Sequence, residues 1–167
     1  WRPVQERIAA ERVGAFGAIA VVLALLLKVA LLAQLGSLGV AVVCTSLFLA
    51  HVVSRTWPLL MIRLLPHVGD AAGSKSKPLA DQITVGALLA AILWCFMALA
   101  PVFIAYPAIK GVAIGVALAF TAVAFGVMLR WFRRRLGGFT GDCLGATQQV
   151  CELAFYLGIA VGWGLSA

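Results

Sequence analysis

The residues best suited to chemistry lie in the segment 133–146, which reads RRRLGGFTGDCLGA. Its arginines, Arg133, Arg134 and Arg135, are candidate phosphate contacts, although basic residues also end apolar spans and anchor them at lipid headgroups. Gly137, Gly138 and Gly141 permit close backbone approach to a ligand. Asp142 opens the next apolar block and is a candidate Mg²⁺ ligand, with a helix N-cap as its structural alternative.

A second group of polar residues lies in the apolar block that follows. Gln148, Gln149, Glu152 and Tyr156 fall within about 100° of arc on a helix. Glu152 would lie roughly a third of the way into the hydrocarbon, where an ionisable residue marks a functional site by default. A polar seam between helices is the alternative. Lys28 is a conceivable partner, but an axial offset of about 10 Å argues against a direct salt bridge.

A third candidate is the loop 66–78, PHVGDAAGSKSKP, in which Lys75 and Lys77 stand among glycines and serines. Ammonium and backbone N–H groups of such a loop can bind phosphate, although the Walker spacing is absent. A connector whose lysines only set the topology is the alternative.

Composition identifies the elements that must carry these residues. The chain has 167 residues, of which 63% are hydrophobic and 11% charged. Five apolar blocks, each about long enough to cross a bilayer as a helix, cover residues 13–35, 36–53, 83–105, 109–128 and 144–165. Unpaired strands are excluded from lipid, so we predict an all-α, polytopic membrane helical bundle of about five transmembrane helices in one domain, 1–167.

The basic residues are distributed unequally between the two ends of these spans. Eleven lie before the first span, between the second and third, and after the fourth, whereas Lys110 alone lies on the other side. The positive-inside rule therefore predicts a cytoplasmic N-terminus. Because the basic residues flank apolar spans, the net charge of +7 does not indicate nucleic-acid binding.

Two local patterns bear on packing. We expect the second span to continue as a helix through Pro58, and this continuation would protrude into the cytoplasm. An interfacial segment anchored by Trp57 is the alternative. The pairs Gly111/Gly115 and Gly158/Gly162 have the spacing that lets membrane helices approach closely. Glycine is also common in membrane helices, so close packing of the last two spans stays open.

The segment RRRLGGFTGDCLGATQQVCELAF resembles the C-terminal signature of cobalamin synthase (adenosylcobinamide-GDP ribazoletransferase). The matching residues are Gly137, Gly138, Thr140, Gly141, Asp142, Gly145 and Glu152. The opening RVGAFG at residues 12–17, and Ser54-Arg55 followed by MIRLLP, also resemble that family. Two features differ: the family has an Asp-rich run upstream of the first match, and an aspartate where this chain has Ala10. Since the chain begins Trp1-Arg2-Pro3, we expect upstream sequence that carries the Asp-rich run.

The resemblance implies a Mg²⁺-dependent transferase of the bacterial cytoplasmic (inner) membrane. Its substrates would be adenosylcobinamide-GDP and α-ribazole or its 5′-phosphate, and its products adenosylcobalamin or its phosphate and GMP. Asp142 would bind Mg²⁺, Asp142 and Glu152 would be catalytic, and Thr140 would join the glycines, arginines and lysines at the substrate phosphates. The lipid bilayer is the other expected partner, and the oligomeric state, a homo-oligomer included, stays open.

Two other functions remain as alternatives. A CDP-alcohol type phosphotransferase would carry a DGxxAR motif, which is absent. A transporter or structural membrane subunit would distribute polar residues through several spans, whereas here they gather at one face and in the last span.

Overall fold

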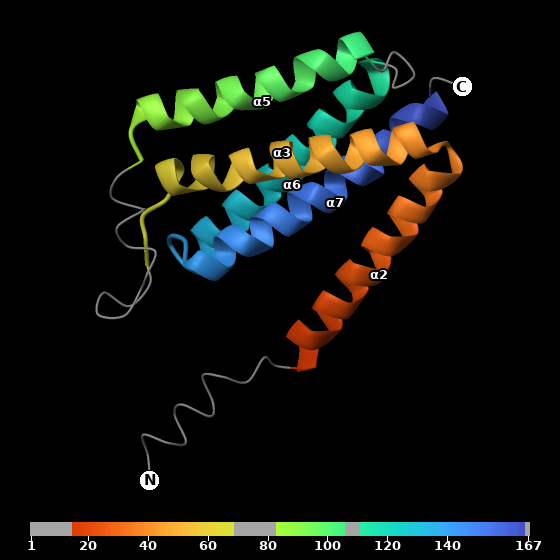
Figure 1. The fold of residues 1–167 in the computed structure, drawn as a ribbon. Coiled ribbons are helices and arrows are strands. Elements are labelled where there is room, and N and C mark those ends of the chain that lie inside the picture. The colour runs from red at the N-terminus through yellow and green to blue at the C-terminus, as the bar shows by residue number, and fades with distance from the viewer. Residues whose placement is uncertain (1–14, 69–82, 106–110, 166–167) are drawn as a thin grey trace.

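The computed structural model describes residues 15–68, 83–105 and 111–165, which form five α-helices (Figure 1). They are α2 (Ala15–Ser37), α3 (Val40–Leu64), α5 (Val85–Ala105), α6 (Gly111–Arg135) and α7 (Gly141–Leu165). No strand occurs among the described residues, where His67 and Phe139 form an isolated bridge. The predicted all-α fold is therefore confirmed.

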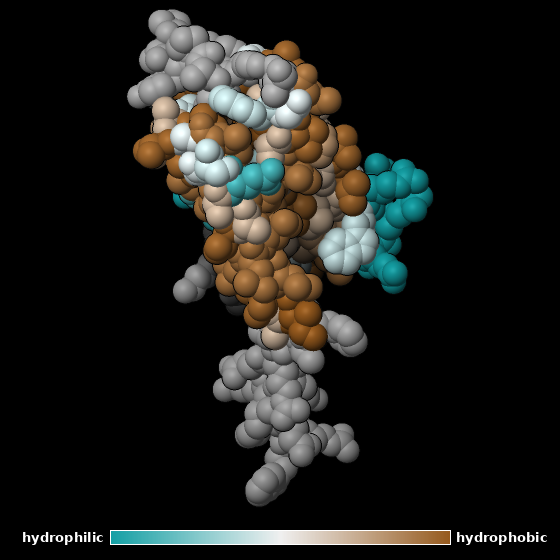
Figure 2. All heavy atoms as spheres, turned by 90° about the vertical axis from the view of Figure 1, so that its right-hand side faces the viewer, coloured by the Kyte–Doolittle hydropathy of each residue, from teal (hydrophilic) through white to brown (hydrophobic). Residues whose placement is uncertain are grey.

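All five helices are long and apolar enough to cross a membrane. Large hydrophobic side chains are exposed along them, among them Leu26 at 61% and Leu93 at 60%. On the face drawn in Figure 2, hydrophobic side chains cover most of the described surface. Such a surface needs lipid or further protein against it, so the chain is a multi-pass membrane protein, as predicted.

The second span continues through Pro58 as one helix, α3, which confirms the expected continuation. Pro58 lacks an N–H and therefore leaves the carbonyl of Ser54 without its usual helical donor. Nearby hydroxyls bond to the backbone in this stretch, since Thr56 Oγ1 donates to the carbonyl of Val53 at 2.8 Å.

The centre of the bundle is the antiparallel pair of α6 and α7, against which α3 packs. A Cβ added to Gly158 or Gly162 would overlap Ala117 or Ala113 respectively, so the two backbones touch at these points. Close packing of the last two spans is thus present. The opposing small residues are alanines, because a Cβ on Gly115 meets no atom within 4 Å.

A second hydrophobic cluster lies where α3, α6 and α7 meet the loop between α6 and α7. It includes Met61, Phe125, Phe132, Phe139 and Cys143, all buried. This cluster fixes the end of α3 against the α6–α7 hairpin and so positions the Gly-rich loop.

Candidate functional site

The loop between α6 and α7 is tied to the chain that follows α3. The N–H of Phe139 donates to the carbonyl of Pro66 at 3.0 Å, and the N–H of Val68 donates to the carbonyl of Phe139 at 3.0 Å. A Cβ on Gly138 would overlap the Pro66 carbonyl oxygen. Gly138 is therefore required by backbone packing, which is a physical reason that the sequence alone did not reveal.

Gly137 also has a local structural reason. Its φ of 71° lies in the left-handed region, which glycine adopts without steric penalty. It directly follows the last turn of α6, where a left-handed residue commonly ends a helix. Gly137 and Gly138 therefore each have a structural role in the loop, in addition to the close approach to a ligand that the sequence predicts.

Helix α7 begins at Gly141, so Asp142 lies inside its first turn and is not the N-cap. Thr140 precedes the helix, and its carbonyl accepts the N–H of Leu144 at 3.3 Å. The Asp142 side chain is exposed. A carboxylate in this position is favoured by the helix dipole and is free to meet a ligand outside the bundle.

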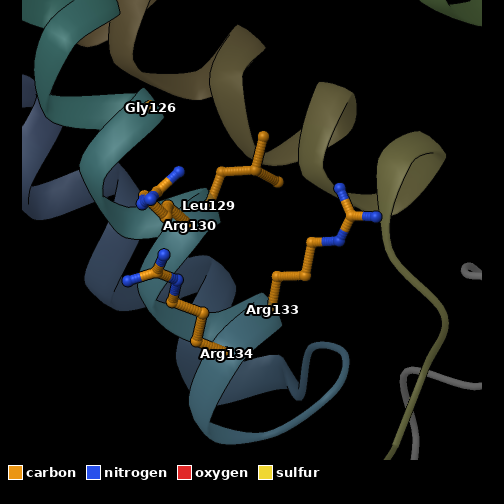
Figure 3. Close-up of a pocket in the computed structure, with 5 residues that line it drawn as sticks. All are labelled: Gly126, Leu129, Arg130, Arg133 and Arg134. Atoms are coloured by element: carbon orange, nitrogen blue, oxygen red, sulfur yellow. The ribbon is translucent and has the colours of Figure 1, made fainter.

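The arginines of the motif form the last turn of α6 and are exposed. Two of them, Arg133 and Arg134, line a cavity of about 490 Å³ together with Gly126, Leu129 and Arg130. Figure 3 shows Arg133 directed toward α3, while Arg130 and Arg134 project together on the other side of α6. Their guanidinium groups make this end of the bundle suited to phosphate.

Glu152 is buried, at 1% exposure. Three neighbouring polar side chains approach its Oε1 atom. Lys28 Nζ lies 2.6 Å from Oε1, and the hydroxyl of Tyr156 donates to the same oxygen at 2.8 Å. His51 Nδ1 lies 3.7 Å from it. Three helices, α2, α3 and α7, therefore meet at one carboxylate oxygen.

The expectation that Lys28 and Glu152 do not form a direct salt bridge is wrong. It treated the first span as parallel to the last, whereas Figure 1 shows α2 inclined to α3 and α7 and diverging from them toward its N-terminal end. Distance along an inclined helix overstates depth in the membrane. The flexible stem of the lysine covers the remaining offset.

Asp142 and Glu152 do not form one site. They are ten residues apart on α7, which corresponds to about 15 Å along the axis. Within the described parts of the chain, no group of three or more His, Cys, Asp or Glu side chains could hold a metal ion. A Mg²⁺ ion bound through one carboxylate and substrate phosphates is compatible with Asp142, while Glu152 is already paired with Lys28.

Lys75 and Lys77 lie outside the described residues, so their predicted phosphate contacts stay predictions. Two residues near the sites were missed. Arg130 lies one helical turn before Arg133 and Arg134, and this spacing was the available signal. His51 carries no motif, and only the packing of α3 on α7 brings it to Glu152.

Comparison with known proteins agrees with the sequence resemblance. The family model described as cobalamin-5-phosphate synthase matches residues 7–160. The chain is 65% identical over 163 residues to a protein of Albidiferax ferrireducens named adenosylcobinamide-GDP ribazoletransferase, covering 91% of this chain and 58% of the relative. A protein of the same name from Polaromonas naphthalenivorans is 58% identical, with 90% and 58% covered.

A more distant protein of that name, from Leptothrix cholodnii, is 41% identical, with 91% of this chain and 57% of the relative covered. The chain thus spans somewhat less than three fifths of the length of these relatives. No solved structure matches it. Because the family model extends over nearly all of the chain, the chain belongs to the cobalamin-5-phosphate synthase family.

Proposed function

We propose that the protein joins adenosylcobinamide-GDP to α-ribazole or its 5′-phosphate and releases GMP. A hydroxyl of the nucleoside attacks the phosphorus attached to the cobinamide, and the bond to GMP breaks. The names of the curated relatives support this reaction. Such a transfer needs positive charge around the leaving phosphate, because charge develops there as the bond breaks.

The observation that carries the proposal is the gathering of charge at one end of the bundle. Arg130, Arg133 and Arg134 line a cavity at the end of α6, and Asp142 lies in the first turn of α7, seven residues after the end of α6. The loop between them is held in place by the backbone hydrogen bonds of Phe139 with Pro66 and Val68. The guanidinium groups would bind the diphosphate, with Thr140, Gly141 and the lysines Lys75 and Lys77 as further contacts.

Mg²⁺ is part of the proposal. Asp142 would supply one carboxylate, and substrate phosphate oxygens and further carboxylates would complete the coordination. The bound ion would neutralise charge on the diphosphate. What this chain itself contributes is the exposed position of Asp142 at the same end of the bundle as the arginine cluster, and a loop between them that is hydrogen-bonded to Pro66 and Val68.

We assign the protein to the bacterial inner membrane with a cytoplasmic N-terminus. The asymmetry of the basic residues supports this orientation. It would bring the ends of α3 and α6 and the beginning of α7 to the cytoplasm, where nucleotide substrates are found. A cysteine introduced at Ser37, at the opposite end of α2, should react with a membrane-impermeant reagent only from the outer side.

The experiment is a transfer assay on detergent-solubilised protein expressed from its complete coding sequence. GMP release should require both adenosylcobinamide-GDP and the nucleoside, and the corrinoid product should appear in equal amount. Arg130→Gln and Arg134→Gln should raise KM for the GDP-activated corrinoid, whereas Lys110→Gln, at the opposite membrane side, should not. Absence of GMP release from folded, Mg²⁺-supplied protein would refute the proposal.

A further inference from the structure

The end of α6 carries two arginines that form no ion pair within the described parts of the chain. Arg130 and Arg134 are four residues apart, and Figure 3 shows them projecting together, on the side of α6 away from Arg133. The ion pairs among the described residues all involve Glu152 instead. Like charges one helical turn apart repel each other, and an anion bound between the two guanidinium groups would remove this repulsion.

The face of α6 that carries these arginines becomes apolar toward the middle of the helix. Gly126 lies one turn before Arg130, and the exposed side chains of Val123 and Val127, at 68% and 61%, lie on the same side. These five residues share about 100° of arc. A membrane-facing helix surface that is apolar along its length and basic at its end matches a phospholipid, whose acyl chains lead to an anionic phosphate.

Gly126 keeps a hollow open beneath the two guanidinium groups. It lines the arginine cavity together with Leu129. A Cβ added to Gly126 meets no atom within 4 Å, so no helix contact requires glycine at this position. Glycine inside a helix is less stable than alanine, and no close backbone contact offsets that cost here. The missing side chain instead leaves room for an apolar group of a ligand next to the arginines.

Trp131 indicates the depth of the cavity in the membrane. It directly follows Arg130, and its side chain is 54% exposed. Exposed tryptophans of membrane proteins are enriched at the level of the lipid headgroups, where the ring contacts both apolar and polar groups. The turn of α6 that contains Arg130 and Trp131 would therefore lie at the level of the lipid phosphates. A lipid beside α6 would meet the cavity with its phosphate at the height of the arginines.

We propose that the arginine cavity binds an anionic phospholipid, with its phosphate between Arg130 and Arg134 and an acyl chain over Gly126. This inference rests on the function proposed above, because the same arginines would bind the diphosphate of the GDP-activated corrinoid. Both ligands offer phosphate oxygens to the guanidinium groups. The lipid therefore occupies the cavity in the absence of substrate, the substrate displaces it, and the two compete.

The first test measures lipid binding and does not depend on activity. Protein expressed from its complete coding sequence is placed in detergent with phosphatidylglycerol or with phosphatidylcholine of the same acyl chains, and native mass spectrometry counts the lipids retained. The wild type should retain phosphatidylglycerol in preference, because the choline group cancels the charge of the phosphate. Each arginine near an anionic lipid should contribute about 5-fold to its affinity, so Arg130→Gln combined with Arg134→Gln should abolish the preference.

Two matched controls separate the cavity from general charge. Arg55→Gln combined with Arg63→Gln removes the same charge from exposed positions of α3, and it should keep the preference. Gly126→Leu fills the hollow without changing any charge, so it should lower phosphatidylglycerol retention several-fold. Gly115→Leu adds the same side chain on α6 where a Cβ also meets no atom within 4 Å, and it should retain the lipid as the wild type does.

The second test measures competition in vesicles. As phosphatidylglycerol replaces phosphatidylcholine, KM for the GDP-activated corrinoid should rise several-fold in the wild type while kcat stays constant. An anionic surface also repels an anionic substrate, but this effect acts on every variant alike. Gly126→Leu should therefore show only this smaller, general rise in KM, whereas Gly115→Leu should show the full rise.

The two proposals fail in different ways. If the wild type releases no GMP, the transferase proposal fails, while the lipid count still decides whether the cavity binds lipid. If the wild type retains both lipids equally, or if the variant lacking Arg130 and Arg134 keeps the preference, the cavity is not an anionic lipid site. If KM has the same lipid dependence in the wild type and in Gly126→Leu, the lipid does not compete with the substrate.

Discussion

Lys28 Nζ lies 2.6 Å from Glu152 Oε1 and joins α2 to α7 inside the membrane-spanning part of the bundle. The first turns of α2 are largely exposed. The buried side chains of this helix, Leu31 and Leu35, lie on the C-terminal side of Lys28. The ion pair is therefore one of a small number of contacts that fix this helix against the others. It also holds the carboxylate that faces His51.

Removing one partner of this pair should destabilise the bundle more than removing both. Lys28→Met leaves Glu152 buried without its cation, which typically costs about 3–5 kcal/mol. Lys28→Met combined with Glu152→Gln removes both charges and should recover much of that loss. Thermal unfolding in detergent would measure the difference, with Gln34→Met, an exposed site on the same helix, as the control. Equal stability of the single and double variants would show that the pair contributes no net coupling.

How much of the structure could be predicted from the sequence depends on how far apart in the sequence the interacting residues lie. Runs of apolar residues define the five spans, because helix length must match bilayer thickness. The unequal distribution of the basic residues and the continuation of α3 through Pro58 can likewise be read from neighbouring residues in the sequence. The pairing of Lys28 with Glu152 depends on the inclination of α2, and no local pattern encodes a crossing angle.

The small-residue contacts show the same limit. Both Gly-x-x-x-Gly pairs have the right spacing, yet Gly115 faces open space while Gly158 touches the backbone of α6. Spacing identifies which residues allow close approach, but the partner face is chosen by the packing of whole helices. For the same reason the sequence offered no cause for Gly138, whose neighbour Pro66 is more than seventy residues away.

Gly158→Ala should separate α6 from α7, because the new methyl group would overlap the backbone of Ala117. Overpacking of this kind typically costs about 1–3 kcal/mol. Gly115→Ala adds the same methyl group where no atom lies within 4 Å, so it should be neutral or slightly stabilising. Chemical unfolding of the two variants in matched micelles provides the comparison. If Gly158→Ala were as stable as Gly115→Ala, the close α6–α7 contact would be wrong.

Gly138→Ala should loosen the loop that holds the arginine cluster to α7. A methyl group there would overlap the carbonyl oxygen of Pro66, which accepts the N–H of Phe139. We expect faster proteolysis of the loop and a lower transfer rate. Gly145→Ala, four residues into α7 and with no atom within 4 Å of a new Cβ, should leave proteolysis unchanged. Equal cleavage rates for the two variants would contradict the tethering of this loop.

Asp142→Asn tests whether the carboxylate binds metal. Since α7 begins at Gly141, Asp142 is in the first turn, and its structural contribution there is its charge at the positive end of the helix dipole. Losing that charge should cost about 0.3–1 kcal/mol, which thermal unfolding without Mg²⁺ would measure. A hard cation prefers a charged oxygen ligand, so loss of a Mg²⁺ ligand should instead shift the Mg²⁺ concentration for half-maximal GMP release upward and lower turnover.

The comparison needs a variant that changes stability by a similar amount without changing charge. Gln149→Ala serves, because Gln149 is exposed on the same helix, two turns further along. Asp142→Glu, which keeps the charge but moves it by one methylene, should retain part of the Mg²⁺ response. If Asp142→Asn showed the small loss of stability with wild-type turnover and an unchanged Mg²⁺ requirement, the carboxylate would serve the helix dipole alone. The metal would then be held entirely by other groups and by the substrate.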